Sequence, residues 1–317
     1  MLKKLIIPAV AVILATSANA ASTTQLEDNK MQAIELNTEV GKLAANLYLP
    51  KGVEKPPVVI VTGAWTTVKE QMPANYAQAL ADKGYAAITF DFRGWGQSKD
   101  ATPYLEDPTR KTQDIRAVIN AVAQLEQING NKIAGLGICA SSGYMLDAVS
   151  GNGKISSVAV VAPWLHDKAM ATAIYGGEES VKNLLTIADK AQHSNEPMLI
   201  EAASLTNEDA LMFQAPYYTE ADRGLIKEYD NKYNVASWTG WLNYDAQQGA
   251  TSQDKPVLLV ISEAMALPAG AHQYLGAAGK NVTSVWLDDV SQFDFYDQPK
   301  AINDAVNAIT KHFKQSL

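Results

Sequence analysis

A short segment in the middle of the chain places a nucleophilic side chain where a strand must turn abruptly into a helix. The segment reads Gly137-Ile138-Cys139-Ala140-Ser141. So sharp a turn needs small residues two positions before and after its apex, because larger side chains would collide, and Gly137 and Ser141 meet that need. Cys139 would then lie at the N-terminus of a helix, where the helix dipole and free N–H groups favour a thiolate. The pattern predicts a nucleophile elbow with Cys139 as the attacking group.

Two other interpretations of this segment stay open. Cys139 is the only cysteine of the chain and cannot form an internal disulfide. A lone free cysteine is often a small apolar core residue. Alternatively, Ser141 or Ser142 would be the nucleophile in a shifted register, which leaves Cys139 where the elbow needs a small residue.

The elements that position this segment alternate between strand and helix along the first half of the chain. Such alternation with short connections implies right-handed crossovers and a parallel sheet, so the sequence predicts an α/β fold. The expected strands are 32–36 and 42–49 in a hairpin, then 58–61, 86–90, 132–137, 157–162, 256–262 and 282–287. The expected helices are 71–83, 114–128, 140–149 and 301–313.

The alternation breaks after residue 163. Helical patches occur at 181–191 and 208–213, and we find no strand-like run before about residue 254. We interpret residues 164–254 as a helical lid inserted into a single domain that spans residues 21–317, because no linker or repeat divides the chain. Five aromatic residues of this region are expected to form the lid core, over a site that could hold an apolar acyl group: Trp164, Tyr217, Tyr218, Trp238 and Trp241.

The first 20 residues have the pattern of a secretory signal peptide. Lys3 and Lys4 precede an apolar run, and Ala18-Asn19-Ala20 has the form of a cleavage site. The run is shorter than the roughly 20 residues of a membrane span, and no later run approaches that length. We therefore expect a periplasmic or secreted protein without a membrane span. The chain has 34 acidic and 26 basic residues, and a net negative charge disfavours binding to a phosphate backbone. No nucleic-acid partner is therefore expected.

Together these features resemble the α/β-hydrolase superfamily. The resemblance rests on the order of elements, the elbow, the lid and the turn Asp91-Phe92-Arg93-Gly94-Trp95-Gly96-Gln97-Ser98. The cysteine at the apex resembles the dienelactone-hydrolase-like branch, and the stretches 63–71, 106–108 and 163–167 resemble a bacterial subgroup of uncharacterised hydrolases. The resemblance implies a mostly parallel central sheet of about eight strands with flanking helices and a helical lid. It also implies that Asp91 and Arg93 stabilise their turn.

The resemblance further implies roles for residues around the elbow. An oxyanion hole would come from the backbone N–H of Ala140 and of Ala64 or Trp65. The catalytic acid would be Glu263, just past the strand 256–262, unless it is a solvated loop carboxylate. The general base would be a histidine in the loop after the last strand.

This chain departs from the family pattern at the position of that base. Related sequences read small-His-x-Asp-x-Tyr-Asp, whereas this one reads Ser291-Gln292-Phe293-Asp294-Phe295-Tyr296-Asp297. Gln292 stands where the histidine is expected, and glutamine cannot accept a proton at neutral pH. Losing a positioned general base typically costs about 10² to 10⁴ in rate. A thiolate could still attack an activated acyl group, and hydrolysis of the resulting thioester would then be slow.

Two other histidines are candidates for a substitute base. His166 follows the carboxyl end of a strand, and His272 lies on the helix after Glu263; otherwise each is a surface or packing residue. His193 lies within the lid, and His312 on the terminal helix is expected to be solvated. No His or Cys cluster has zinc spacing, and Gly94-x-Gly96 lacks a third glycine, so neither a metal nor another cofactor is expected.

The leading hypothesis is an exported α/β-hydrolase-like enzyme that acts on a small-molecule carboxylic ester or thioester. It would work as a hydrolase or acyl transferase through a Cys139 thiolate, with impaired or atypical deacylation. The alternative is a catalytically silent protein of the same fold that binds a small apolar acyl-type ligand. The intact elbow motivates the first hypothesis, and the substituted base, Gln292, motivates the second.

Overall fold

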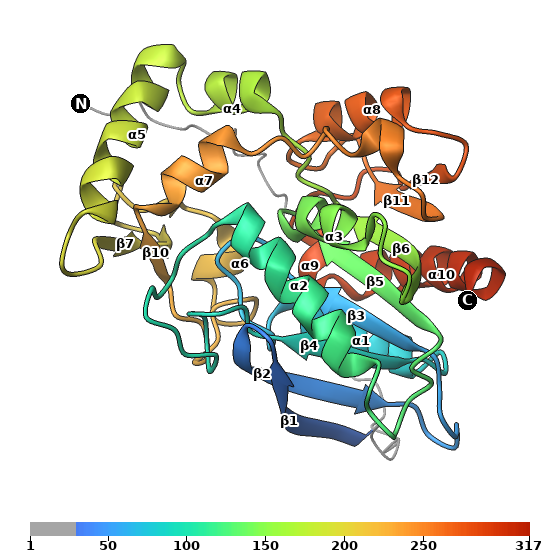
Figure 1. Ribbon diagram of the computed structural model, residues 1–317. Helices are drawn as coiled ribbons and strands as arrows, with labels where there is room; N and C mark the ends of the chain where they lie inside the picture. The colour runs from blue at the N-terminus through green and yellow to red at the C-terminus, as the bar shows by residue number, and fades with distance from the viewer. Residues whose placement is uncertain (1–29) are drawn as a thin grey trace, which may run out of the picture.

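Eight strands form the central sheet in the computed structural model, which describes residues 30–317 (Figure 1). Their order across the sheet is β1-β2-β4-β3-β5-β6-β11-β12, and only β1–β2 and β2–β4 pair antiparallel. The predicted signal peptide, residues 1–20, lies outside the described residues. The strands are β1 (Lys30–Thr38), β2 (Gly41–Leu49), β3 (Val58–Thr62), β4 (Ala86–Phe90), β5 (Ile133–Ile138), β6 (Ile155–Val161), β11 (Val257–Ile261) and β12 (Val282–Trp286).

The centre of the sheet is buried on both faces. Strands β3, β4, β5 and β11 are apolar along their length and wholly buried, as expected for parallel strands covered by helices. Helices α1 (Met72–Ala81) and α10 (Pro299–Ser316) pack on each other against one face, and α2 (Pro108–Val122) and α3 (Ser141–Val149) against the other (Figure 1). In α10, buried Ile302, Val306, Ile309 and Phe313 recur every three or four residues and form its apolar stripe.

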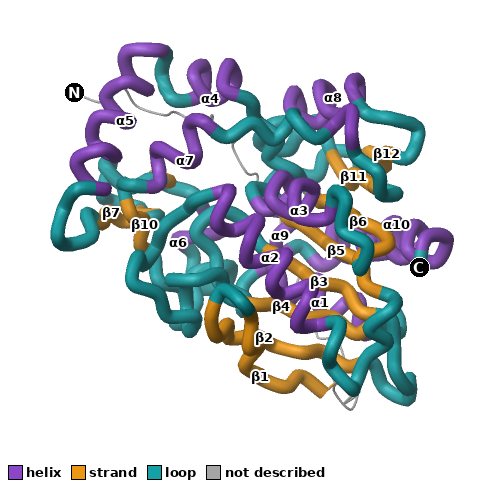
Figure 2. Tube along the Cα trace, viewed as in Figure 1, coloured by secondary structure: helices purple, strands orange, loops and turns teal. Residues whose placement is uncertain are grey.

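The chain leaves the sheet after β6 and returns at β11. This insertion, residues 162–256, carries α4, α5 and α7 beyond the ends of the strands (Figure 2). Its helices are α4 (Lys168–Ile174), α5 (Glu178–Gln192), α6 (Pro216–Thr219), α7 (Ser237–Asn243) and the 3₁₀ turn η1 (Ala250–Ser252). Two small sheets accompany them: β7 (Leu199–Glu201) with β10 (Lys232–Asn234), and β8 (Ala203–Ser204) with β9 (Met212–Phe213).

These short strands contradict the expectation of an insertion without strands. The predicted helical patch 208–213 is also wrong, since it ends in β9. Strands of two or three residues are too short to give an alternating pattern, so their pairing depends on contacts made only in the folded chain.

The predicted helix 114–128 lies six residues too late in the sequence. In the structure α2 begins at Pro108, and the side chain of Asp107 accepts a hydrogen bond from the N–H of Arg110 at 2.8 Å. An aspartate cap followed by proline is a strong helix start. The remaining helices near the sheet are α8 (Pro268–Ala277) after β11 and α9 (Asp294–Asp297) before α10.

The turn after β4 is held by two ion pairs. Asp91 accepts hydrogen bonds from the backbone N–H groups of Lys69 and Gln97, both at 2.9 Å, and from Lys69 Nζ at 2.8 Å. Arg93 Nε donates to Asp114 at 2.5 Å. Asp91 and Arg93 therefore stabilise this turn, as the family resemblance implies.

Candidate active site

The elbow is a strained turn between β5 and α3. Cys139 has a φ of +57°, in the left-handed region that non-glycine residues rarely adopt. A Cβ at Gly137 would lie 2.8 Å from the carbonyl oxygen of Ser141, so a larger residue would not fit. The carbonyl of Cys139 accepts hydrogen bonds from the N–H groups of Ser142 and Trp164, at 3.1 and 3.0 Å. The strain and the need for a small residue agree with the predicted elbow geometry.

The two serines of the elbow are bonded to the backbone. Ser141 Oγ donates to the carbonyl of Ile138, and Ser142 Oγ donates to that of Gly137, each at 3.1 Å. Both serines are fully buried. Their hydroxyl groups therefore support the turn, and the interpretation with a serine nucleophile in a shifted register is not supported.

The Cys139 thiol is buried among hydrogen-bond donors. Its side chain interacts with the hydroxyl of Tyr296 and with the backbone N–H groups of Ala140 and Trp65, and each contact lowers the thiol pKa. Burial has the larger effect and raises the pKa of Cys139 above its ordinary value. The expectation that the helix N-terminus would favour a thiolate is therefore wrong for the resting site, since loss of solvation outweighs the local dipoles.

The same contacts distinguish the two candidates for the second oxyanion donor. The Trp65 N–H faces the cysteine, whereas the carbonyl of Ala64 accepts hydrogen bonds from the N–H and hydroxyl of Thr67. The amides of Ala140 and Trp65 are thus the pair that converges on Cys139, in the arrangement of an oxyanion hole.

Gln292 is placed beside the nucleophile, with every polar group of its amide in use. Its Nε2 donates to the carbonyl of Ala162 at 3.0 Å and to the hydroxyl of Tyr296 at 2.9 Å. Its Oε1 accepts a hydrogen bond from the N–H of Ala266 at 2.9 Å. Gln292 therefore donates to Tyr296, whose hydroxyl in turn contacts Cys139, and an amide cannot act as a base.

Glu263 follows β11 but faces away from the buried nucleophile. Its side chain is 69% exposed and pairs with Nε2 of His272 at 2.8 Å. The His272 ring is 55% exposed and stacks on Trp286 at 4.7 Å. The two residues form a surface pair, so neither contacts Gln292 or Cys139 through a hydrogen bond in the described part of the chain.

The remaining histidines have structural partners. His166 is buried; its Nε2 lies 3.0 Å from the carbonyl of Trp241 and its ring packs on the Trp241 indole. Burial lowers the pKa of His166. His193 caps α5 and is exposed. His312 lies 2.9 Å from Ser157 Oγ and is half-buried, so its expected solvation is wrong.

Cys139 is only 7% exposed, and Trp65, whose backbone N–H faces it, belongs to a cluster of aromatic rings. The Trp65 ring stacks on Trp241 at 4.7 Å and meets Tyr233 and Trp238 edge-on. Of the five aromatic residues predicted for the lid core, Trp164 is half-buried and the rest are buried: Tyr217, Tyr218, Trp238 and Trp241.

Sequence reasoning did not assign a role to Tyr296 or Glu106. Both stood inside motifs that carried the family resemblance, but no spacing rule connects residues 106, 139 and 296. Glu106 contributes to the electrostatic environment of Cys139, as do Tyr144, Tyr175 and Tyr218. Only the folded chain brings these groups together.

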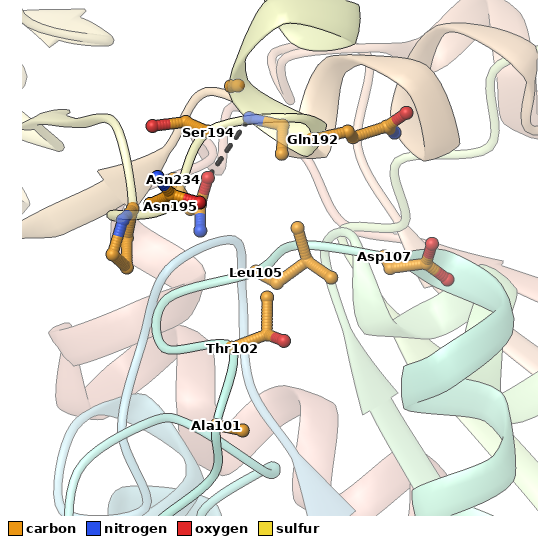
Figure 3. A pocket seen from close by; sticks show the side chains of 11 residues that line it. Ala101, Thr102, Leu105, Asp107, Gln192, Ser194, Asn195 and Asn234 are labelled. Atoms are coloured by element: carbon orange, nitrogen blue, oxygen red, sulfur yellow. Dashed lines mark hydrogen bonds between the residues drawn. The ribbon is translucent and has the colours of Figure 1, made fainter.

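A separate cavity of about 280 Å³ lies where the insertion meets the body of the protein (Figure 3). Thr102, Leu105 and Asp107 line it from the segment before α2, and Gln192 and Asn234 line it from the insertion. Its lining does not include Cys139. Among residues 30–317, no group of three or more His, Cys, Asp or Glu side chains could hold a metal ion.

The chain is similar to a known protein family and to several known proteins. The sequence model of the X-Pro dipeptidyl-peptidase (S15) family matches residues 41–262, more than half of the chain. The protein PA2218 of Pseudomonas aeruginosa is 33% identical over 118 residues, which make up 37% of this chain and 32% of that protein. Its crystal structure superposes with a TM-score of 0.80 and 20% identity, covering 95% of this chain and 100% of that one.

Two other solved structures identify the fold. The α/β hydrolase GrgF from Penicillium sp. sh18 has a TM-score of 0.78 and 17% identity over 90% of this chain and 99% of its own. The dienelactone hydrolase of Anabaena variabilis has a TM-score of 0.56 and 12% identity over 92% and 100%. The predicted α/β-hydrolase fold is confirmed. No described helix is both long and apolar enough to cross a membrane.

The contact between Tyr296 and Cys139 predicts a change in thiol reactivity. Tyr296→Phe removes a donor that lowers the pKa of Cys139, so alkylation by iodoacetamide should need a higher pH than in the wild type. The measurement is the alkylation rate against pH, followed by intact mass. Tyr48→Phe, a buried tyrosine on β2, is the control and should leave the profile unchanged. An unchanged profile in Tyr296→Phe would contradict the contact.

Proposed function

This chain belongs to the X-Pro dipeptidyl-peptidase (S15) family, and from that premise we propose that it is a hydrolase of carboxylic esters or thioesters with Cys139 as nucleophile. The observation that carries the proposal is the strained Cys139 at the elbow, with the N–H groups of Ala140 and Trp65 facing its side chain. Residues are placed in this way to bind the oxyanion of an acyl-transfer reaction.

The proposed reaction has two steps. The sulfur of Cys139 attacks the acyl carbon, an S–C bond forms, and the bond to the leaving group breaks while that group takes up the thiol proton. Water or another acceptor then attacks the thioester carbon, the S–C bond breaks, the acid or new acyl product leaves, and the acceptor's proton returns to the sulfur. The first step needs the oxyanion hole and a reactive sulfur, whereas the second needs a base to deprotonate water.

Because Gln292 cannot act as a base, hydrolysis of the thioester is expected to be the slow step. The amide bonds to Ala162, Tyr296 and Ala266, and an amide oxygen is too weakly basic to take a proton from water at neutral pH. We therefore propose that the acyl-enzyme accumulates. The aromatic cluster around Trp241 favours an apolar acyl group, because its rings would pack against such a group when it enters.

The glutamine at position 292 also favours a second candidate function. A protein that keeps the pocket and has no base could bind an acyl-type ligand without turning it over. The hydrogen bond between Glu263 and His272 fits this candidate, since the carboxylate that would be the family's acid is 69% exposed and bonded to another histidine.

The acylation step predicts a covalent adduct. During exposure to p-nitrophenyl acetate, intact-mass spectrometry should find one acetyl group on Cys139, with a burst of product followed by slow release. Cys139→Ala should give neither adduct nor burst. If the wild type forms no adduct but is thermally stabilised by the ester, the binding protein is the better description; adduct formation in Cys139→Ala would contradict the proposed nucleophile.

Restoring the histidine predicts faster deacylation. Gln292→His supplies a base beside Tyr296, and steady-state turnover should rise by about 10-fold or more, up to the roughly 10² to 10⁴ attributed to a positioned general base. Adding His272→Ala should raise it further, because Glu263 then loses its surface partner. Turnover of the same ester is the measurement, with His272→Ala alone as the control. No gain in either Gln292→His variant would contradict the assigned position of the base.

We also propose that the chain is exported and that residues 1–20 are removed. Expressed in a Gram-negative host, the protein should appear in the periplasmic or culture fraction with Ala21 as its first residue, which mass spectrometry of the N-terminal peptide measures. Replacing both Ala18 and Ala20 with Glu should block cleavage, because the site requires small residues there. A cytoplasmic protein that retains Lys3 and Lys4 would contradict export.

A further inference from the structure

A buried carboxylate lies beneath the oxyanion hole. Glu106 is fully buried, and its Oε2 accepts hydrogen bonds from the Thr66 N–H at 3.1 Å and from Lys111 Nζ at 2.7 Å. Its Oε1 accepts a hydrogen bond from the hydroxyl of Tyr144 at 3.0 Å. A carboxylate that leaves water needs several such partners to offset its lost hydration.

Two of these partners belong to the elements that supply the oxyanion hole. Thr66 directly follows Trp65, whose N–H faces Cys139. Tyr144 lies in α3, the helix that begins just after Ala140. Glu106 therefore links the loop after β3 to the helix after the elbow, and each of these two segments carries one oxyanion donor.

The loop after β3 needs support at this point. Thr66 has a φ of +63°, in the left-handed region, where a β-branched residue is strained. Such strain persists only where surrounding contacts compensate for it. The bond from the Thr66 N–H to Glu106 and the contact between Thr66 Oγ1 and the Tyr229 hydroxyl at 3.1 Å are those contacts.

Lys111 limits the electrostatic effect of Glu106 on the nucleophile. The negative charge of Glu106 raises the pKa of Cys139. Lys111 Nζ pairs with the carboxylate and also lies over the rings of Phe92 and Trp95, at 4.6 and 4.7 Å from their centroids. The carboxylate can thus serve as an acceptor while paired with a cation.

The backbone around Glu106 is held independently of its side chain. Leu105 and Asp107 face the cavity where the insertion meets the body (Figure 3), and Asp107 caps α2. The N–H of Glu106 itself donates to Ser237 Oγ at 2.8 Å. The carboxylate is therefore presented from a well-anchored segment.

We propose that Glu106 is a positioning residue that holds the Trp65 N–H in the oxyanion hole through its bond to the Thr66 amide, with Lys111 as its counter-ion. This inference rests on the proposed function of Cys139. Oxyanion donors act because they are oriented before the reaction begins, so a loop that drifts would stabilise the transition state less.

Two double variants with side chains of similar size test whether Glu106 must accept the hydrogen bond of the Thr66 amide. Glu106→Met with Lys111→Met removes the acceptor and both charges, whereas Glu106→Gln with Lys111→Met removes the charges but keeps an oxygen for the Thr66 amide. Replacing a whole buried ion pair is often tolerated, unlike removing one partner. Arg93→Met with Asp114→Leu replaces another ion pair involving α2 and is the matched control.

Two measurements are made on the full chain: the rate of Cys139 acylation by p-nitrophenyl acetate and amide hydrogen exchange of the peptide that covers residues 63–71. The methionine variant should acylate about 10- to 100-fold more slowly, below the full loss of an oxyanion donor, and should exchange faster in residues 63–71. The glutamine variant should stay close to the wild type in both. The control should change neither.

Wild-type acylation in the methionine variant would overturn the inference, as would equal loss in all three double variants, since that would indicate general destabilisation. If the methionine variant does not fold, Glu106→Leu with Lys111→Met replaces it. If the wild-type protein itself is not acylated, the proposed function fails. The exchange of residues 63–71 then decides alone whether Glu106 holds this loop.

Discussion

The left-handed turn at Cys139 is the constraint on which the rest of the site depends. A non-glycine residue in this region costs on the order of 1–3 kcal/mol, and the surrounding structure must compensate. Here the compensation comes from the close approach allowed by Gly137, from the hydroxyl of Ser142, and from the two N–H groups that bond the Cys139 carbonyl. Because the turn is so tight, the Ala140 N–H is directed at the sulfur, and the Trp65 loop must be held to match it.

Gln292 can hold its loop in place by hydrogen bonds but cannot transfer protons. A histidine at this position would join the last loop to the nucleophile and also move protons. The glutamine keeps the first property, since it ties its loop to Ala162 and Ala266 and donates to Tyr296. It cannot provide the second. The architecture around Cys139 is therefore complete in shape, and the step that needs a base is the one that the residues present do not support.

The sequence predicted the parts of the structure that follow from local sterics and periodicity. The small residues around Cys139 are a local requirement, and the central strands are continuous apolar runs, so both were identified correctly. The contacts of Glu263 and Glu106 could not be predicted from the sequence. One carboxylate is exposed against His272 and the other is buried against Thr66 and Lys111, and this difference depends on how distant segments pack. The short strands of the insertion were not predicted for the same reason.

Burial raises the pKa of Cys139 and bears on why a cysteine suits this site. A serine in the same position would need a base to become nucleophilic, whereas a thiol needs only moderate help. Yet burial leaves Cys139 almost inaccessible and raises its pKa. Because loss of hydration is the largest cause of the raised thiol pKa, any movement that lets water reach the sulfur would lower the pKa of Cys139 toward its ordinary value.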